Sequence, residues 1–221
     1  MKNHPKRCPC ASCAAIAAGK SPEQAIKDHL AWAEEQLRKH GFYVHLVAAG
    51  DDTSPTGFNA HTHGLAEGHQ HPDFQIIIPL AEAVALELFH NLADRVKGGE
   101  RFASGQLVSE IISSAGGLVK LIDATEGDRP VLRVVLPDRH GNLGLGAIGG
   151  DGGGFDLQYQ DVMSERDWRR YQLAMKVREA LDLERLRDAI AALQSTDSPW
   201  LVPLCDQLQA RVRQLEQKAK G

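Results

Sequence analysis

The sequence predicts an α+β fold, with a mixed, largely antiparallel sheet and packed helices, followed by a C-terminal helical hairpin. Three observations support this prediction. Apolar residues recur at helical spacing over 21–41, 81–97 and 164–215. Short runs rich in β-branched and aromatic residues, typical of strands, lie between the first two of these stretches and after the second. Strands that follow one another with few helices between them favour α+β over a doubly wound parallel fold.

The first helix has clear start and stop signals. Ser21 can cap it, Pro22 suits the first helical position, and Gln24 completes a capping box. Gly41 is a natural C-terminal stop. The helix carries one apolar stripe that we expect to be buried, formed by Ile26, Leu30, Ala33 and Leu37.

After Gly41 the spacing of apolar residues changes from that of a helix to that of short strands. We expect strands over 42–48, 58–62, 74–78, 106–112, 118–122 and 131–136, and a helix over 81–97. Residues 164–194 are strongly helical, and a last helix begins at Ser198-Pro199. Its apolar stripe consists of Leu201, Leu204, Leu208, Val212 and Leu215. This stripe must be buried somewhere, either in a homodimer formed through residues 164–221 or against the chain's own body.

Length and charge narrow the class of protein. A chain of 221 residues suggests one or two domains, and its net charge of −4 argues against nucleic-acid binding. No apolar run is long enough for a membrane span, and the N-terminus lacks a secretory signal, so we expect a cytoplasmic protein. Charge shifts along the chain suggest a Cys-containing segment (1–20), an α+β domain (21–160) and the helical hairpin (161–221).

Histidine is concentrated in one segment, because four of the ten histidines fall within residues 61–71. On a strand, His61 and His63 would point to the same face, and a turn could return His69 or His71 to them. Neutral imidazole is a common ligand for zinc and other divalent transition metals. Glu67 and Asp73 could act as a catalytic base or orient a ligand. The cluster therefore predicts a metal centre; a metal-free polar pocket and structural or exposed histidines are the alternatives. His45 and His140 are further candidates.

Cysteine forms a second cluster near the N-terminus. Cys8, Cys10 and Cys13 lie within six residues, in a run that resembles the start of the zinc-binding SEC-C motif. Three thiolates are one ligand short of a closed zinc site, and His4 or Cys205 could supply the fourth. A redox role for Cys10 and Cys13, or an unmetallated tail, are the alternatives.

Glycine is concentrated in residues 141–154, which hold eight of the 21 glycines. Residues 144–149 match the pattern G-x-G-x-x-G, which binds dinucleotides where it joins a strand directly to a helix. Here the predicted strand ends near Leu136, and the glycines that follow cannot start a stable helix. We therefore expect a mobile loop here.

Several motifs in the central region occur in a recognisable order. They are Lys39-His40-Gly41-Phe42-Tyr43-Val44, a run from Phe58 to Gly64-Leu65, His71-Pro72-Asp73-Phe74, Gly98-Gly99, and Val131 to Asp138 with Gly141. Together they resemble an uncharacterised bacterial family, the domain-of-unknown-function 4262 family, over about residues 37–141. The resemblance implies an α+β domain and supplies no reaction. His71 is the one imidazole of the cluster that matches the family pattern.

Two functions from different classes follow. The first is that the chain binds a metal ion through the histidine cluster, and a metal-dependent hydrolase is the more specific form of this hypothesis. The second is a non-catalytic interaction module, an adaptor or toxin-neutralising partner, suggested by the apolar stripes of the terminal helices and by the lack of a strong catalytic signature.

Overall fold

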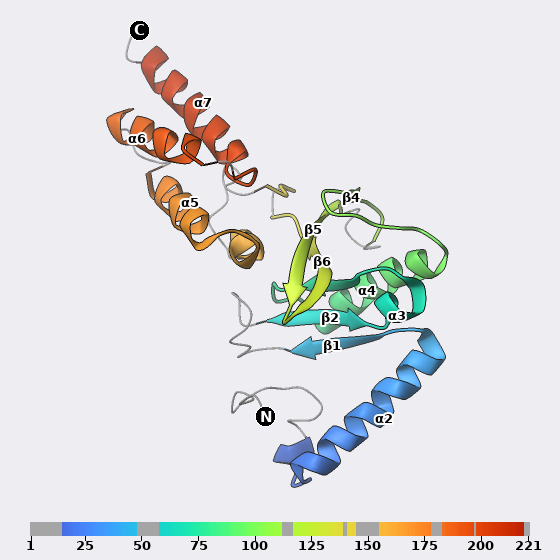
Figure 1. The fold of residues 1–221 in the computed structure, drawn as a ribbon. Helices are drawn as coiled ribbons and strands as arrows, with labels where there is room; N and C mark the ends of the chain where they lie inside the picture. Colours follow the sequence, from blue (N-terminus) through green and yellow to red (C-terminus); the bar gives the residue numbers. More distant parts are fainter. Residues whose placement is uncertain are drawn as a thin grey trace. The chain divides into compact units, whose positions relative to one another are not determined.

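The chain folds into two compact units, Met1–Leu136 and Pro137–Gly221. A computed structural model describes residues 15–47, 58–111, 117–138, 141–144, 155–177, 183–196 and 198–218. The first unit contains a sheet with helices, and the second is helical (Figure 1). No helix in the described ranges is both long enough and apolar enough to cross a membrane.

The sheet has six strands in the order β1-β2-β3-β6-β5-β4. All neighbouring strands are antiparallel except β3 and β6, which are parallel. The strands are β1 (Tyr43–Val47), β2 (Asn59–His63), β3 (Asp73–Ile76), β4 (Leu107–Val108), β5 (Val119–Glu126) and β6 (Arg129–Val135). The mixed, largely antiparallel α+β fold is therefore confirmed. The expected strand over 106–112 is reduced to two residues, whereas β5 extends beyond the expected 118–122 to Glu126.

Helix α4 (Glu82–Lys97) supplies much of the core of the first unit. Its apolar residues recur every three to four positions, so they share one face. The buried ones are Ala85, Leu88, Phe89, Leu92, Ala93 and Val96. The short helix α3 (Leu65–His69), which the sequence did not predict, lies between β2 and β3 and contacts α4.

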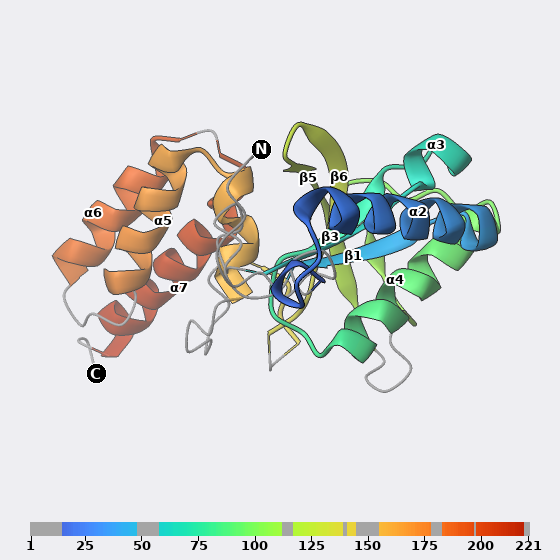
Figure 2. The same cartoon turned by 90° about the horizontal axis from the view of Figure 1, so that it is seen from below.

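Helix α2 (Pro22–His40) has the predicted ends but buries a different face. The Ser21 side chain accepts a hydrogen bond from the Gln24 amide, and the chain turns left-handed at Gly41, whose φ is +78°. The expectation of a buried stripe is wrong, because Ile26, Leu30 and Leu37 are exposed and only Ala33 of that set is buried. The buried residues of α2 are instead Ala25 and Ala33, and the helix contacts edge strand β1, where His29 and Trp32 lie beside Tyr43 (Figure 2).

The described residues of the second unit form a 3₁₀ helix and three α-helices. They are η1 (Phe155–Val162), α5 (Glu165–Val177), α6 (Leu183–Gln194) and α7 (Val202–Lys218). Helix α5 packs against α6, and α6 against α7, so the region expected as one helix over 164–194 is two helices (Figure 2). The stripe of α7 is largely buried within the chain, with Leu204 and Leu208 completely covered. Homodimerisation through residues 164–221 stays a prediction.

Candidate metal centre

The pairing of β1 with β2 gathers histidines on one face of the sheet. His45 lies opposite His61, and Tyr43 lies opposite His63. Cross-strand partners share a face, and alternate residues of one strand return to it, so His45, His61 and His63 are neighbours. One ligand nitrogen from each of these imidazoles lies within 4.8 Å of the others. The predicted same-face pair, His61 and His63, is confirmed, and His45 completes the group.

The three rings are close enough for one ion to contact all of them. The ring centroids of His61 and His63 are 4.8 Å apart, and those of His45 and His61 are 5.1 Å apart. A tetrahedral zinc ion with Zn–N bonds of about 2.0–2.1 Å holds its ligand nitrogens about 3.4 Å apart. Binding of one ion would therefore draw the ligand nitrogens, which lie within 4.8 Å of one another, closer together.

A chain of hydrogen bonds fixes the tautomer of His61. The guanidinium of Arg133, which can only donate, donates to Gln75 Oε1 from Nε (3.0 Å) and a terminal nitrogen (2.8 Å). Gln75 therefore presents its Nε2 to Asn59 Oδ1 at 3.2 Å, which makes that Asn59 atom an acceptor. His61 Nδ1 lies 3.1 Å from the same oxygen and must donate its proton to it. The lone pair of neutral His61 is consequently on Nε2.

Burial keeps two of the imidazoles neutral. Loss of hydration lowers the pKa of His61 to about 2, with further lowering from His63, His45 and Arg129. The same effect of burial, followed by the charge of Arg129, lowers the pKa of His63 to about 3. Since a metal binds the neutral imidazole, both side chains are in the ligating form at neutral pH.

Carboxylate and guanidinium groups line one side of the histidine group. Glu126 Oε1 lies 3.9 Å from His61 Nε2, and Glu126 Oε2 lies 3.4 Å from a terminal nitrogen of Arg129. Arg129 also donates to Asp73 Oδ2 at 2.6 Å and to the Thr62 carbonyl at 3.2 Å. Glu126 thus approaches His61, and Arg129 connects it to the buried Asp73.

Asp73, predicted as a base or orienting residue, holds the backbone around β2 and α3. Its Oδ1 accepts hydrogen bonds from Thr62 Oγ1 (2.8 Å) and the Leu65 amide (3.2 Å). Burial raises the pKa of the Asp73 carboxyl, whereas the hydrogen bond from Thr62 and the charge of Arg129 lower it. Both oxygens of Asp73 accept hydrogen bonds, from Thr62, the Leu65 amide and Arg129, so this residue stabilises the backbone next to the site.

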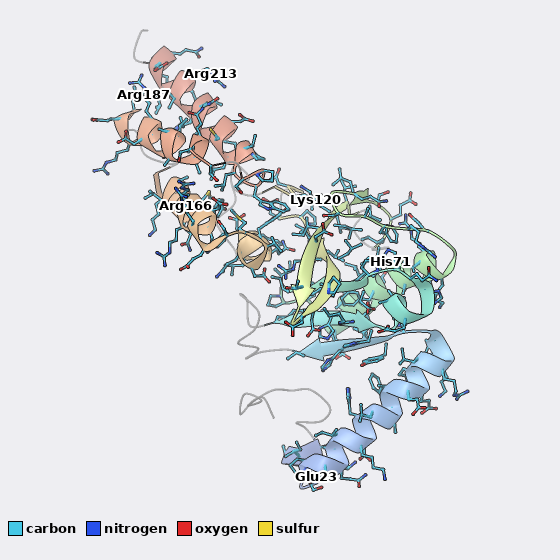
Figure 3. All side chains as sticks on the ribbon, in the orientation of Figure 1. Glu23, His71, Lys120, Arg166, Arg187 and Arg213 are labelled. Atoms are coloured by element: carbon cyan, nitrogen blue, oxygen red, sulfur yellow. The ribbon has the colours of Figure 1, made fainter. Side chains whose placement is uncertain are left out.

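The other predicted ligands lie outside the group of three. His71, labelled in Figure 3, is buried; its Nδ1 donates to the Pro72 carbonyl at 2.6 Å, and its Nε2 accepts from the Phe102 amide at 3.1 Å. Both ring nitrogens are used to join two segments of backbone. His69 ends α3, with its Nε2 packed beside Gly41.

Glu67 belongs to a surface pocket next to the histidine group. The pocket is lined by Leu37, Gly41, Tyr43, His63, Gly64, Glu67 and Gly68. His63 is shared between the pocket and the imidazole group, so the pocket offers a route by which a small molecule could approach.

Aromatic side chains cover the outer side of the imidazoles. Tyr43 stacks on His63, with ring centroids 4.7 Å apart and planes at 17°. The ring of His29, on α2, has its centroid 5.6 Å from that of His45 and 5.6 Å from that of Trp32. Helix α2 thus places a fourth imidazole beside the group, although nothing in the sequence spacing identifies it.

Two predicted features lie outside the described residues. They are the cysteine cluster, Cys8, Cys10 and Cys13, and most of the glycine-rich segment, 145–154. His4 and His140 lie outside them as well.

The fold and the site define an α+β protein with a group of three histidines able to hold a metal ion. Residues 36–144 match the model of a family described as Domain of unknown function (DUF4262), and this part of the chain belongs to that family. The resemblance seen in the sequence is therefore confirmed. The comparison with curated proteins gave no significant match, and neither did the comparison with solved structures.

Proposed function

We propose that this protein binds a divalent transition metal through His45, His61 and His63. The observation that supports the proposal is the proximity of three ligand nitrogens, within 4.8 Å of one another, on two paired strands. The lone pair on His61 Nε2, fixed by Asn59, and the neutral state of His63 add to it. Imidazole suits zinc, copper, iron and nickel, and zinc is the first metal to test.

The chemical role we propose is that of a metal-dependent hydrolase. Three imidazoles leave at least one coordination position for water, and a metal ion lowers the pKa of a bound water to about 7. The pocket that shares His63 would admit a small substrate to that position. Glu67, on the wall of the pocket, would contact the substrate.

Metal analysis of untagged full-length protein tests the proposal. After loading with zinc and removal of free metal, we expect a metal bound per chain at the histidine group, lost in His45→Ala and His61→Ala. His40→Ala is the matched control, because His40 is exposed on α2 and distant in sequence from β2. A triple variant, Cys8→Ser with Cys10→Ser and Cys13→Ser, separates any metal bound by the cysteines. Full retention of metal by His61→Ala in that triple background would contradict the proposal.

A further inference from the structure

We infer that Glu126 is the fourth ligand of the proposed metal, so that the centre is formed by three imidazoles and one carboxylate. The inference rests on the proposed function and extends it. The inference concerns Glu126, which clusters with Asp123 and Asp128 in the sequence. Such a cluster is typical of a turn.

The β5–β6 hairpin brings Glu126 to the histidines. Glu126 is the last residue of β5 and pairs with Arg129, the first residue of β6, across a turn of two residues. Gly127, with φ +60°, supplies the left-handed conformation at the first position of this turn. The tight turn fixes where the carboxylate leaves the sheet, beside His61 of β2.

Glu126 and His61 bring two electron-rich atoms close to each other. His61 Nδ1 carries the ring proton and donates it to Asn59, so Nε2 presents a lone pair. Glu126 Oε1, also a lone-pair donor, lies only 3.9 Å from that nitrogen. Two such atoms repel each other unless a positive ion or a hydrogen-bond donor lies between them. Coordination of one metal by both atoms removes the repulsion.

Arg129 orients the carboxylate for this role. It contacts Oε2 of Glu126, while Oε1 faces His61. Arg129 already has a closer acidic partner in Asp73, at 2.6 Å compared with 3.4 Å, so Glu126 is not required to neutralise it. This arrangement matches a common pattern in metal sites, in which an outer group holds the second oxygen of a ligating carboxylate.

The Glu126 carboxylate lies outside the group of ligand atoms within 4.8 Å of one another, but its separation from His61 requires only a small adjustment. Ligand atoms of a tetrahedral ion lie about 3.4 Å apart, somewhat closer than the present 3.9 Å between Nε2 and Oε1. The Glu126 side chain is 28% exposed, and therefore freer to turn than the His61 side chain, which is 4% exposed. With Glu126 as the fourth ligand, a tetrahedral ion has no position left for the water of the proposed hydrolase, so that role requires an ion that accepts five or six ligands.

Titration of metal-free, full-length protein with Zn²⁺ and with Co²⁺ tests the inference. We expect Glu126→Gln to weaken binding by about 10–100-fold and to change the visible spectrum of the bound Co²⁺, because an anionic carboxylate donor is replaced by a neutral amide. The matched control is Asp123→Asn, an exposed acid on the same strand, which should bind within about twofold of the parent.

The outcomes separate this inference from the proposed function. If Glu126→Gln binds both ions as the parent does, with the same Co²⁺ spectrum, Glu126 is not a ligand although the three-histidine centre stands. If the parent itself binds neither ion, both ideas fail. Thermal melting of each metal-free variant shows whether it folds; should Glu126→Gln unfold, Glu126→Asp shortens the side chain and is titrated instead, with the same expected loss.

Discussion

His45 and His61 lie directly opposite each other on β1 and β2, with ring centroids 5.1 Å apart. This relationship creates the candidate metal centre, because the two residues are far apart in sequence and meet only through strand pairing. A slip of one residue in the register would turn one of the two rings to the opposite face of the sheet. The site therefore depends on the correct pairing of edge strand β1.

Acid should destabilise the metal-free protein through His61. Its pKa is about 2 in the folded chain, compared with an ordinary value of 6.5. Above pH 6.5 the imidazole is neutral in both states, and its contribution to stability is complete. As the pH falls further, only the unfolded chain takes up the proton, so stability decreases by about 1.4 kcal/mol per pH unit until the folded pKa is reached.

Urea denaturation at pH 7.5 and pH 5.5 measures this effect. The metal-free parent should lose more stability between the two pH values than His61→Gln, in which the titrating group is absent. His40→Ala should behave as the parent does. An equal loss in the parent and in His61→Gln would show that the pKa of His61 is not lowered in the folded chain.

Zinc should raise the melting temperature of the parent and leave that of His61→Ala unchanged. A ligand that binds only the folded state stabilises it by RT ln(1 + [L]/Kd), or about 2.7 kcal/mol at a free concentration of 100 times Kd. Differential scanning calorimetry of the metal-free chain with increasing zinc gives the shift. An equal shift in His61→Ala would locate the bound zinc elsewhere.

Much of the fold follows from local patterns in the sequence. Local signals predict where α2 begins and ends, through the Ser21 cap and the stop at Gly41. The apolar period over 81–97 likewise predicts α4 close to its observed bounds. The buried face of α2 does not follow in this way. The buried residues are the small Ala25 and Ala33, whereas hydrophobicity alone favours the larger residues that remain exposed. Which face is covered is decided by tertiary packing, such as that of His29 and Trp32 beside Tyr43 of β1.

The candidate site was only partly predictable for a similar reason. Alternation along one strand placed His61 and His63 on the same face. His45, noted only as a further candidate, joins them through the register of β1 and β2, and Glu126 approaches through a hairpin more than sixty residues further along the chain. His71 was grouped with them by proximity in sequence, whereas its ring joins the backbone at Pro72 to that at Phe102.

Asp73→Asn should destabilise the first unit substantially. Asp73 is 1% exposed and accepts hydrogen bonds from Thr62, the Leu65 amide and Arg129. Breaking a buried ion pair by neutralising one partner costs about 3–5 kcal/mol, and the lower end applies because Arg129 is partly exposed. Urea denaturation should show this loss, and Asp94→Asn, which alters an exposed pair with Lys97, should change stability little. Equal, small effects in both variants would contradict the structural role given to Asp73.

Gly64→Ala should be more destabilising than Gly99→Ala. Both glycines have positive φ, +106° and +99°, so alanine strains the backbone at either position. Only at Gly64 would the new Cβ also collide, at 2.3 Å from Leu37 Cδ2 and 2.9 Å from the Gly41 carbonyl oxygen. Overpacking of this kind costs about 1–3 kcal/mol beyond the shared strain. Melting temperatures measure the difference, and equal losses would mean that Leu37 and Gly41 move aside freely.

Leu208→Ala should destabilise the second unit without changing the mass of the protein in solution. Leu208 is completely buried on α7, where it packs within the chain, so truncation leaves a cavity and costs about 2–5 kcal/mol. Val202→Ala on the same helix removes an exposed side chain and should have little effect. Urea denaturation gives the stability, and sedimentation velocity gives the mass. A dimeric parent that becomes monomeric in Leu208→Ala would instead place this stripe in an interface between two chains, because a residue buried only within its own chain affects stability at any protein concentration.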